Sequence, residues 1–145
     1  MNARDAREKG DDMTVRELIN THPHPTATDR EALVRCVDDC FECAGICTGC
    51  ADACLAEDDV RDLVRCIRLC LDCADVCVAA GRTVLRQTEP DFGVIRATIE
   101  ACAAACRACG DECERHAHHH EHCRICAETC RRCEQACNDL LAAIE

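Results

Sequence analysis

Residues 36–54 read CVDDCFECAGICTGCADAC, with a cysteine at every third or fourth position. Alternating steps of four and three residues keep side chains on one face of an α-helix. Leucine or another large apolar residue normally fills such a face in a helical protein. Thiols take that place here, so this stretch predicts a helix whose core-facing side is lined with cysteine.

The same spacing occurs in three further stretches, and the four stretches together hold all 19 cysteines of the 145-residue chain. These cysteines are Cys36, Cys40, Cys43, Cys47, Cys50, Cys54, Cys66, Cys70, Cys73, Cys77, Cys102, Cys106, Cys109, Cys113, Cys123, Cys126, Cys130, Cys133 and Cys137. Every thiol is therefore expected on the inner side of a helix.

Capping and turn residues divide the cysteine-bearing region into four long helices. The expected N-caps are Thr28, Asp58 or Asp59, and Thr88, with the last helix following a turn within residues 116–121 and ending near Ile144. The first two helices are expected to end near residues 57 and 87. Short connections make neighbouring helices antiparallel. The predicted fold class is all-α: an antiparallel up-down-up-down four-helix bundle with a short N-terminal helix.

The chain divides into an N-terminal extension, residues 1–27, and the Cys-lined four-helix bundle, residues 28–145. Residues 1–12 are almost wholly polar or charged, and we expect them to be disordered. Residues 14–20 combine a capping-box spacing with three apolar residues, which predicts a short amphipathic helix that packs on the larger body.

Extending the cysteine register upstream and downstream of the cysteines on each helix predicts two different bundle ends. One end receives only apolar side chains: Leu33, Ala80, Val84, Phe92, Ile95, Ile99, Leu140 and Ile144. The other receives potential metal ligands and carboxylates: Cys54, Glu57, Asp59, His116, His119, His120 and Cys123. We expect hydrophobic stability from the apolar end, and loading and release of metal ions at the histidine end.

A second stripe, offset by one residue, appears on the first two helices only. Its members are Val37, Phe41, Ala44, Ala51, Leu55, Val60, Val64, Ile67, Leu71, Ala74 and Val78. The stripe either packs inside the monomer or forms a self-association surface. The sequence leaves both interpretations open.

Composition and charge exclude several protein classes. The net charge of −11 argues against nucleic acid as a partner, and no apolar run approaches the length of a membrane span. The cysteine count is odd and the chain shows no charged-then-apolar leader, which argues against a secreted disulfide scaffold. We therefore expect a cytoplasmic protein with reduced thiols.

Thiols at all of these positions favour metal binding over a purely structural role, because cysteine packs a core less well than leucine. Thiolates select soft ions such as Cu(I), with zinc and iron–sulfur clusters as competitors. Four thiolates around Zn²⁺ leave two negative charges buried, whereas one Cu(I) per thiolate gives a neutral core. The candidate metal ligands are the 19 cysteines together with His116, His119 and His120.

Two other chemistries are weighed against Cu(I) storage. A zinc or mixed-metal thiolate sink, of metallothionein-like function, stays open as the alternative, and a redox-active thiol protein is more distant. Catalysis is not expected: the chain has no Glu-x-x-His, the signature of di-iron bundles, and its CxxC pairs lack a surrounding strand–helix alternation.

The fourfold cysteine ladder without an export signal resembles the cytosolic copper storage proteins over about residues 28–144. The resemblance implies multiple Cu(I) ions held by thiolates in the bundle core, loading at one end, and assembly of several bundles, commonly a homotetramer. The exported branch of that family has a leader and methionines near its open end, whereas this chain has only Met1 and Met13. Expected partners are copper ions and either a copper chaperone or a small-thiol carrier.

Overall fold

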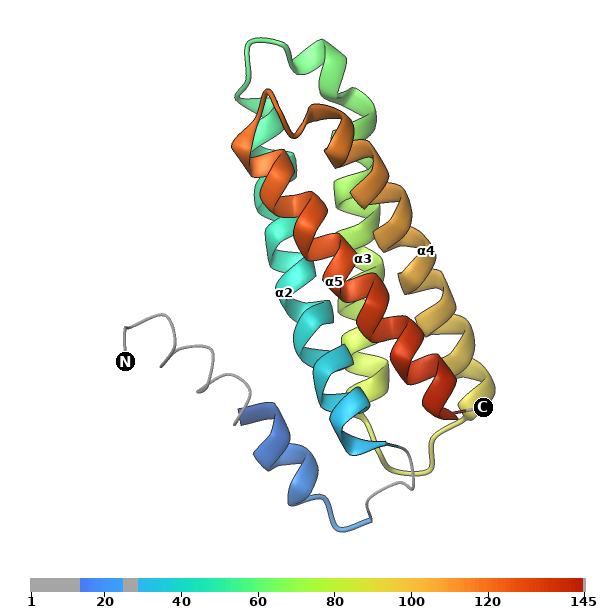
Figure 1. Ribbon diagram of the computed structural model, residues 1–145. Helices are drawn as coiled ribbons and strands as arrows, with labels where there is room; N and C mark the ends of the chain where they lie inside the picture. The colour runs from blue at the N-terminus through green and yellow to red at the C-terminus, as the bar shows by residue number, and fades with distance from the viewer. Residues whose placement is uncertain (1–13, 25–28, 145) are drawn as a thin grey trace.

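Four long antiparallel helices pack side by side in the structure, a computed structural model that describes residues 14–24 and 29–144 (Figure 1). They are α2 (Arg30–Leu55), α3 (Val64–Leu85), α4 (Phe92–His116) and α5 (Glu121–Ile144), and the 3-10 helix η1 (Val60–Leu63) precedes α3. Helices α2 and α4 each pack against both α3 and α5. The predicted all-α, up-down-up-down bundle is confirmed, and within the described residues there is no β-strand.

Aspartates, and not the predicted threonines, cap two of the long helices. Asp29 caps α2 through its Oδ1, which accepts hydrogen bonds from the backbone N–H groups of the next turn; Thr28 lies outside the described residues. The cap predicted at Thr88 is wrong, because Asp91 Oδ1 accepts the N–H of Val94 at 3.1 Å and starts α4 there. A carboxylate at this position also favours the positive end of the helix dipole.

The connection between α2 and α3 differs from the expected tight turn. The first helix ends at Leu55, and the four-residue η1 precedes α3, so the second helix is not continuous from Asp58 or Asp59. Asp59 stands at the start of η1 but makes no side-chain cap. Its carboxylate accepts a hydrogen bond from His120 Nε2 at 3.0 Å instead, so this residue joins the two connections at one bundle end.

The N-terminal segment 14–20 is helical, as predicted, and lies beside the opposite end of the bundle (Figure 1). Ile19 is buried in the common core and Val15 packs against it, whereas Leu18 is exposed. Arg30 donates a hydrogen bond to Asn20 at 3.0 Å, and His22 contacts Thr88 at 3.2 Å. The disorder predicted for residues 1–12 concerns a part of the chain outside the described residues.

The apolar end is formed as the cysteine register predicts. Leu33, Ala80, Val84, Ile99 and Leu140 are buried there, and Ile95 has 9% of its surface exposed. Only Phe92 is substantially exposed, because it begins α4 at the rim of the bundle. The end therefore carries an ordinary hydrophobic core of large side chains.

The second stripe is divided between core and surface. Its small residues Ala44, Ala51 and Ala74 are buried, as is Val37, whereas its larger members Phe41, Leu55, Val64, Leu71 and Val78 are exposed. Phe41 lies over Gly81 of α3, where an added Cβ would be 2.9 Å from the ring. Packing inside the monomer is thus confirmed for the buried part of the stripe, and self-association through the exposed part stays a prediction. Among the described residues, no helix has the length and hydropathy needed to cross a membrane.

Candidate metal centre

The four helices turn every cysteine toward the bundle axis. Eighteen of the 19 cysteines are 0% exposed and Cys50 is 3% exposed, and all of them are free thiols. The three-and-four spacing explains this arrangement, because it follows the inner face of each helix for about three to five turns. The thiols form one continuous column from Cys36 and Cys137 beside the apolar end to Cys54 at the other end.

Neighbouring sulfurs in this column are separated by 3.6–4.0 Å. Contacts within one helix include Cys43 Sγ to Cys47 Sγ at 3.7 Å. Contacts between helices are equally close, such as Cys66 to Cys113 at 3.6 Å and Cys77 to Cys102 at 3.6 Å. Because a disulfide requires about 2.05 Å, these are separate thiols.

The separations suit a shared metal ion. Three or four sulfurs around one ion, with metal–sulfur bonds of about 2.3 Å, lie about 3.8–4.0 Å apart. Several sets of four sulfurs lie within 4.8 Å of one another, among them Cys40, Cys102, Cys133 and Cys137, and also Cys47, Cys109, Cys126 and Cys130. The sets share members or neighbours, so ions bound along the column would be bridged by common thiolates.

Burial and hydrogen bonding act on these thiols in opposite directions. Burial raises the pKa of the Cys54 thiol, since a thiolate loses its hydration away from water. Hydrogen bonds from Cys137 and Cys40 lower the pKa of Cys36 to about 5. A thiol that donates its S–H to a neighbouring thiolate stabilises that thiolate and keeps its own proton, so only some thiols of the network ionise readily. Metal binding must displace the remaining protons, so metal affinity falls as the pH falls.

His122 is the histidine that contacts the thiol column. Its Nδ1 lies 3.4 Å from Cys50 Sγ, 3.6 Å from Cys123 Sγ and 4.0 Å from Cys54 Sγ. Its Nε2 lies 3.4 Å from Glu57 Oε1. A proton on Nε2, donated to Glu57, leaves the Nδ1 lone pair facing the three sulfurs. This arrangement of ring and carboxylate is typical of metal-binding histidines.

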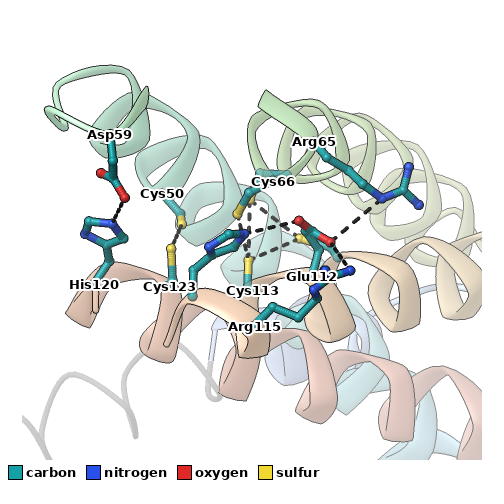
Figure 2. Close-up of polar contacts among 12 residues, drawn as sticks. Cys50, Asp59, Arg65, Cys66, Glu112, Cys113, Arg115, His120 and Cys123 are labelled. Atoms are coloured by element: carbon teal, nitrogen blue, oxygen red, sulfur yellow. Dashed lines mark hydrogen bonds and ion pairs between the residues drawn. The ribbon is translucent and has the colours of Figure 1, made fainter. Parts of the chain in front are cut away.

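His120 is held outside the thiols by two carboxylates. Its Nδ1 lies 3.1 Å from Glu57 Oε2. Its Nε2 lies 3.0 Å from Asp59 Oδ2, and Figure 2 shows this second contact. The hydrogen bond to Asp59, and then the charges of Asp59 and Glu57, raise the pKa of His120. The same hydrogen bond lowers the pKa of Asp59. Glu57 contacts His120 and His122 together, so the two rings and both carboxylates form one polar group over Cys50, Cys54 and Cys123.

His116 and His119 have different surroundings. His116 Nε2 lies 3.2 Å from Glu112 Oε1, one helical turn earlier on α4. His119 lies exposed in the turn after α4, with its ring against His118. A role for His116, His119 or His120 as a metal ligand therefore stays a prediction, and the described contacts bring none of the three as close to sulfur as His122.

Comparisons with known proteins agree on one family. The family model described as copper storage protein matches residues 29–142. The chain belongs to this family. The Streptomyces lividans copper storage protein Ccsp, in its structure loaded with 10 copper equivalents, is 55% identical, with a TM-score of 0.88 over 89% of this chain and 98% of that one.

A second solved structure and one further protein are also similar to this chain. A structure of the cytosolic copper storage protein of S. lividans carrying five coppers is 59% identical, with a TM-score of 0.76 over 77% of this chain and 93% of that one. The uncharacterised cysteine-rich protein YhjQ of Bacillus subtilis strain 168 is 36% identical over 107 residues, which are 74% of this chain and 94% of that protein. The fold of this copper storage family member thus agrees with that of the Ccsp structures.

His122 is not among the candidate ligands predicted from the sequence. A signal was available: His122 lies four residues before Cys126 and therefore continues the cysteine register of α5. His119 was included by a similar step from Cys123, but α5 begins only at Glu121, and a helical register does not extend into a turn. Glu112 was also missed, because nothing in its spacing sets it apart from other surface carboxylates.

Proposed function

We propose that this chain stores and buffers Cu(I) in the cytosol, with thiolates of the bundle core as the ligands. The observation that carries the proposal is the column of 19 buried free thiols, which neighbour one another at metal-sharing distances. Membership in the copper storage family and the likeness to copper-loaded Ccsp structures support it. All 19 cysteines are proposed as ligands, and we expect no catalytic turnover.

Charge balance favours Cu(I) as the cargo. Each Cu(I) neutralises one thiolate, so a filled column of bridged ions carries little net charge in a buried core. The bonds form only in the folded bundle, and their free energy adds to its stability. A zinc or mixed-metal thiolate sink is the second candidate, because sets of four sulfurs such as Cys40, Cys102, Cys133 and Cys137 also fit tetrahedral coordination. Buried charge counts against filling the column with zinc.

Loading and release are proposed at the histidine end. There His122 contacts three thiols, and Glu57 and Asp59 supply negative charge that attracts cations. His116, His119 and His120 are proposed as further transient ligands. Replacing His122 with alanine should slow Cu(I) uptake while removing no more than one ion of the total, with His24→Ala as the control. Unchanged uptake kinetics would discard this route.

Assembly into homotetramers is proposed on the basis of the exposed part of the second stripe. Phe41, Leu71 and Val78 lie exposed on α2 and α3, and apolar side chains grouped on a surface favour association. Sedimentation of the wild-type chain should show a species of four copies. Replacing these three residues with glutamate should shift it toward monomers.

Serine substitution on one helix tests the storage proposal. Replacing the five cysteines of α5 with serine should lower the number of bound Cu(I) ions by about five of 19, by charge balance. Ala127→Ser with Ala136→Ser is the matched control, because these buried residues lie on the same helix beside the thiols. An unchanged copper count in the cysteine variant, with helicity preserved, would contradict the proposal.

A further inference from the structure

The thiols at the histidine end divide into two groups with different surroundings. His122, Glu57 and Asp59 belong to the polar group over Cys50, Cys54 and Cys123, between α2 and α5. A second group lies between α3 and α4, where Cys113 Sγ lies 3.6 Å from Cys66 Sγ and 3.7 Å from Cys70 Sγ. The second group has its own charged residues, which the proposed loading route does not use.

The charged residues at the second group form a compact cluster (Figure 2). Arg65 directly precedes Cys66 on α3, and Glu112 directly precedes Cys113 on α4. The buried Glu112 carboxylate lies 3.8 Å from Arg65 Nε and 3.7 Å from Arg115 Nη1, and its other oxygen lies 3.2 Å from His116 Nε2. Two helices thus place paired charges beside their paired thiols.

Both guanidinium groups remain available for another ligand. The side chains of Arg65 and Arg115 are 72% and 74% exposed. Each has five N–H donors in a planar fork, which suits carboxylates, and neither comes within hydrogen-bonding distance of Glu112. With one carboxylate between two guanidiniums, the cluster carries a net positive charge when His116 is neutral.

The two sides of this end therefore attract different forms of copper. Glu57 and Asp59 favour a positively charged ion, whereas Arg65 and Arg115 repel it and favour an anion. Cu(I) bound by two thiolates is an anion, and carboxylates on those thiols add further negative charge. Cys66 and Cys113 are 0% exposed, so a small carrier suits this site better than the broad surface of a protein.

We propose that Arg65 and Arg115 dock a small, carboxylate-bearing thiol that carries Cu(I), and that Cys66 and Cys113 receive the ion. The inference rests on the proposed function, for which it names the copper donor by its chemistry. The carrier's carboxylate binds the guanidinium groups and places its copper–thiolate centre over the buried sulfurs.

Transfer at this site is a ligand exchange with no change of oxidation state. Two copper–sulfur bonds to the carrier thiolates break, and two form to Cys66 and Cys113. The protons of the two cysteine thiols pass to the departing carrier thiolates, which leave as neutral thiols. The copper complex keeps one negative charge before and after exchange, and the copper remains Cu(I).

The test compares two copper donors in stopped-flow uptake by the full-length, reduced apoprotein. One donor is Cu(I)–glutathione, whose thiols carry carboxylates, and the other is Cu(I) with 2-mercaptoethanol, which carries none. The variant is Arg65→Gln with Arg115→Gln. The matched control, Arg68→Gln with Arg107→Gln, removes one exposed, paired arginine from each of the same two helices, farther from the end.

The arginine variant should lower the ratio of the glutathione rate to the mercaptoethanol rate about three- to tenfold. It should also weaken the salt dependence of the glutathione rate, because docking charges act mainly on association. The control variant should keep the wild-type ratio of rates and the wild-type salt dependence. An unchanged ratio, or an equal change in the control, would overturn the inference.

A separate titration distinguishes this inference from the proposed function. If the wild-type chain takes up Cu(I) from a chelator to near its cysteine count while the ratio stays unchanged, only the docking inference fails. If the chain takes up little Cu(I) from any donor, the storage proposal fails with it.

Discussion

Replacing Leu140 with alanine should separate the stability of the bundle from its metal capacity. Leu140 is 1% exposed and packs in the apolar end with Leu33, Val84 and Ile144. Truncating a fully buried leucine removes its transfer free energy and leaves a cavity, which together cost about 2–5 kcal/mol. We expect a loss near the middle of this range, about 3 kcal/mol, because these neighbours belong to three different helices and cannot collapse freely into the space.

The assay is urea unfolding of the reduced apoprotein, followed by helical circular dichroism under anaerobic conditions. Leu55→Ala is the matched control, because Leu55 is 62% exposed and its truncation should cost less than about 0.5 kcal/mol. Copper titration of Leu140→Ala should give the wild-type number of ions, since no thiol is lost. A destabilisation below about 1 kcal/mol, or a copper count reduced by several ions, would refute the separation of roles between the two ends.

Two pH-dependent predictions follow from carboxylates outside the thiol column. Burial, and then the charge of Glu42, raise the pKa of Asp39 to about 6. The folded state therefore gains stability as the pH falls from about 6 toward the unfolded value near 4. Asp39→Asn should stabilise the apoprotein by roughly 1–2 kcal/mol at pH 7.5, after discounting for partial exposure. Urea unfolding should show this gain disappearing near pH 4, with exposed Asp75→Asn as the control. Separately, Asp59→Asn should move the pKa of His120 down toward about 6.5, as NMR titration of the ring would record. In the wild type, the His120–Asp59 pair should stabilise the fold fully between the unfolded pKa of Asp59 and the unfolded pKa of His120. This stabilisation should be lost as the pH rises through the raised pKa of His120 in the folded protein. It should also be lost as the pH falls through the lowered pKa of Asp59 in the folded protein. An unmoved His120 pKa in Asp59→Asn would contradict the pairing.

The bundle could be predicted from sequence because one periodicity determines it. Nineteen cysteines at steps of three and four leave a single inner face on each helix, and short connections leave only antiparallel neighbours. The apolar end followed from the same register. Helix starts were less predictable: Thr88 and Asp91 both suit an N-cap, and the choice depended on the turn around Glu89, which has a positive φ of 47°.

The histidine end was predicted in outline but not in detail. The register identified the end, and it correctly brought Glu57, Asp59 and His120 together. The register could not show that Asp59 accepts a hydrogen bond from His120 and leaves η1 without a side-chain cap. That hydrogen bond joins residues that are 61 positions apart in the sequence. The placement of His122 against the thiols depends on where α5 begins, and helix boundaries are the least reliable part of such a prediction.

The most direct test of Cu(I) storage is an anaerobic titration of the reduced chain with Cu(I) against a competing chromophoric chelator. Storage by the thiol column predicts a plateau near 19 ions per chain, one for each cysteine. A plateau near four ions, matched by an equal and comparably tight uptake of zinc, would contradict Cu(I) storage and favour a zinc-thiolate sink.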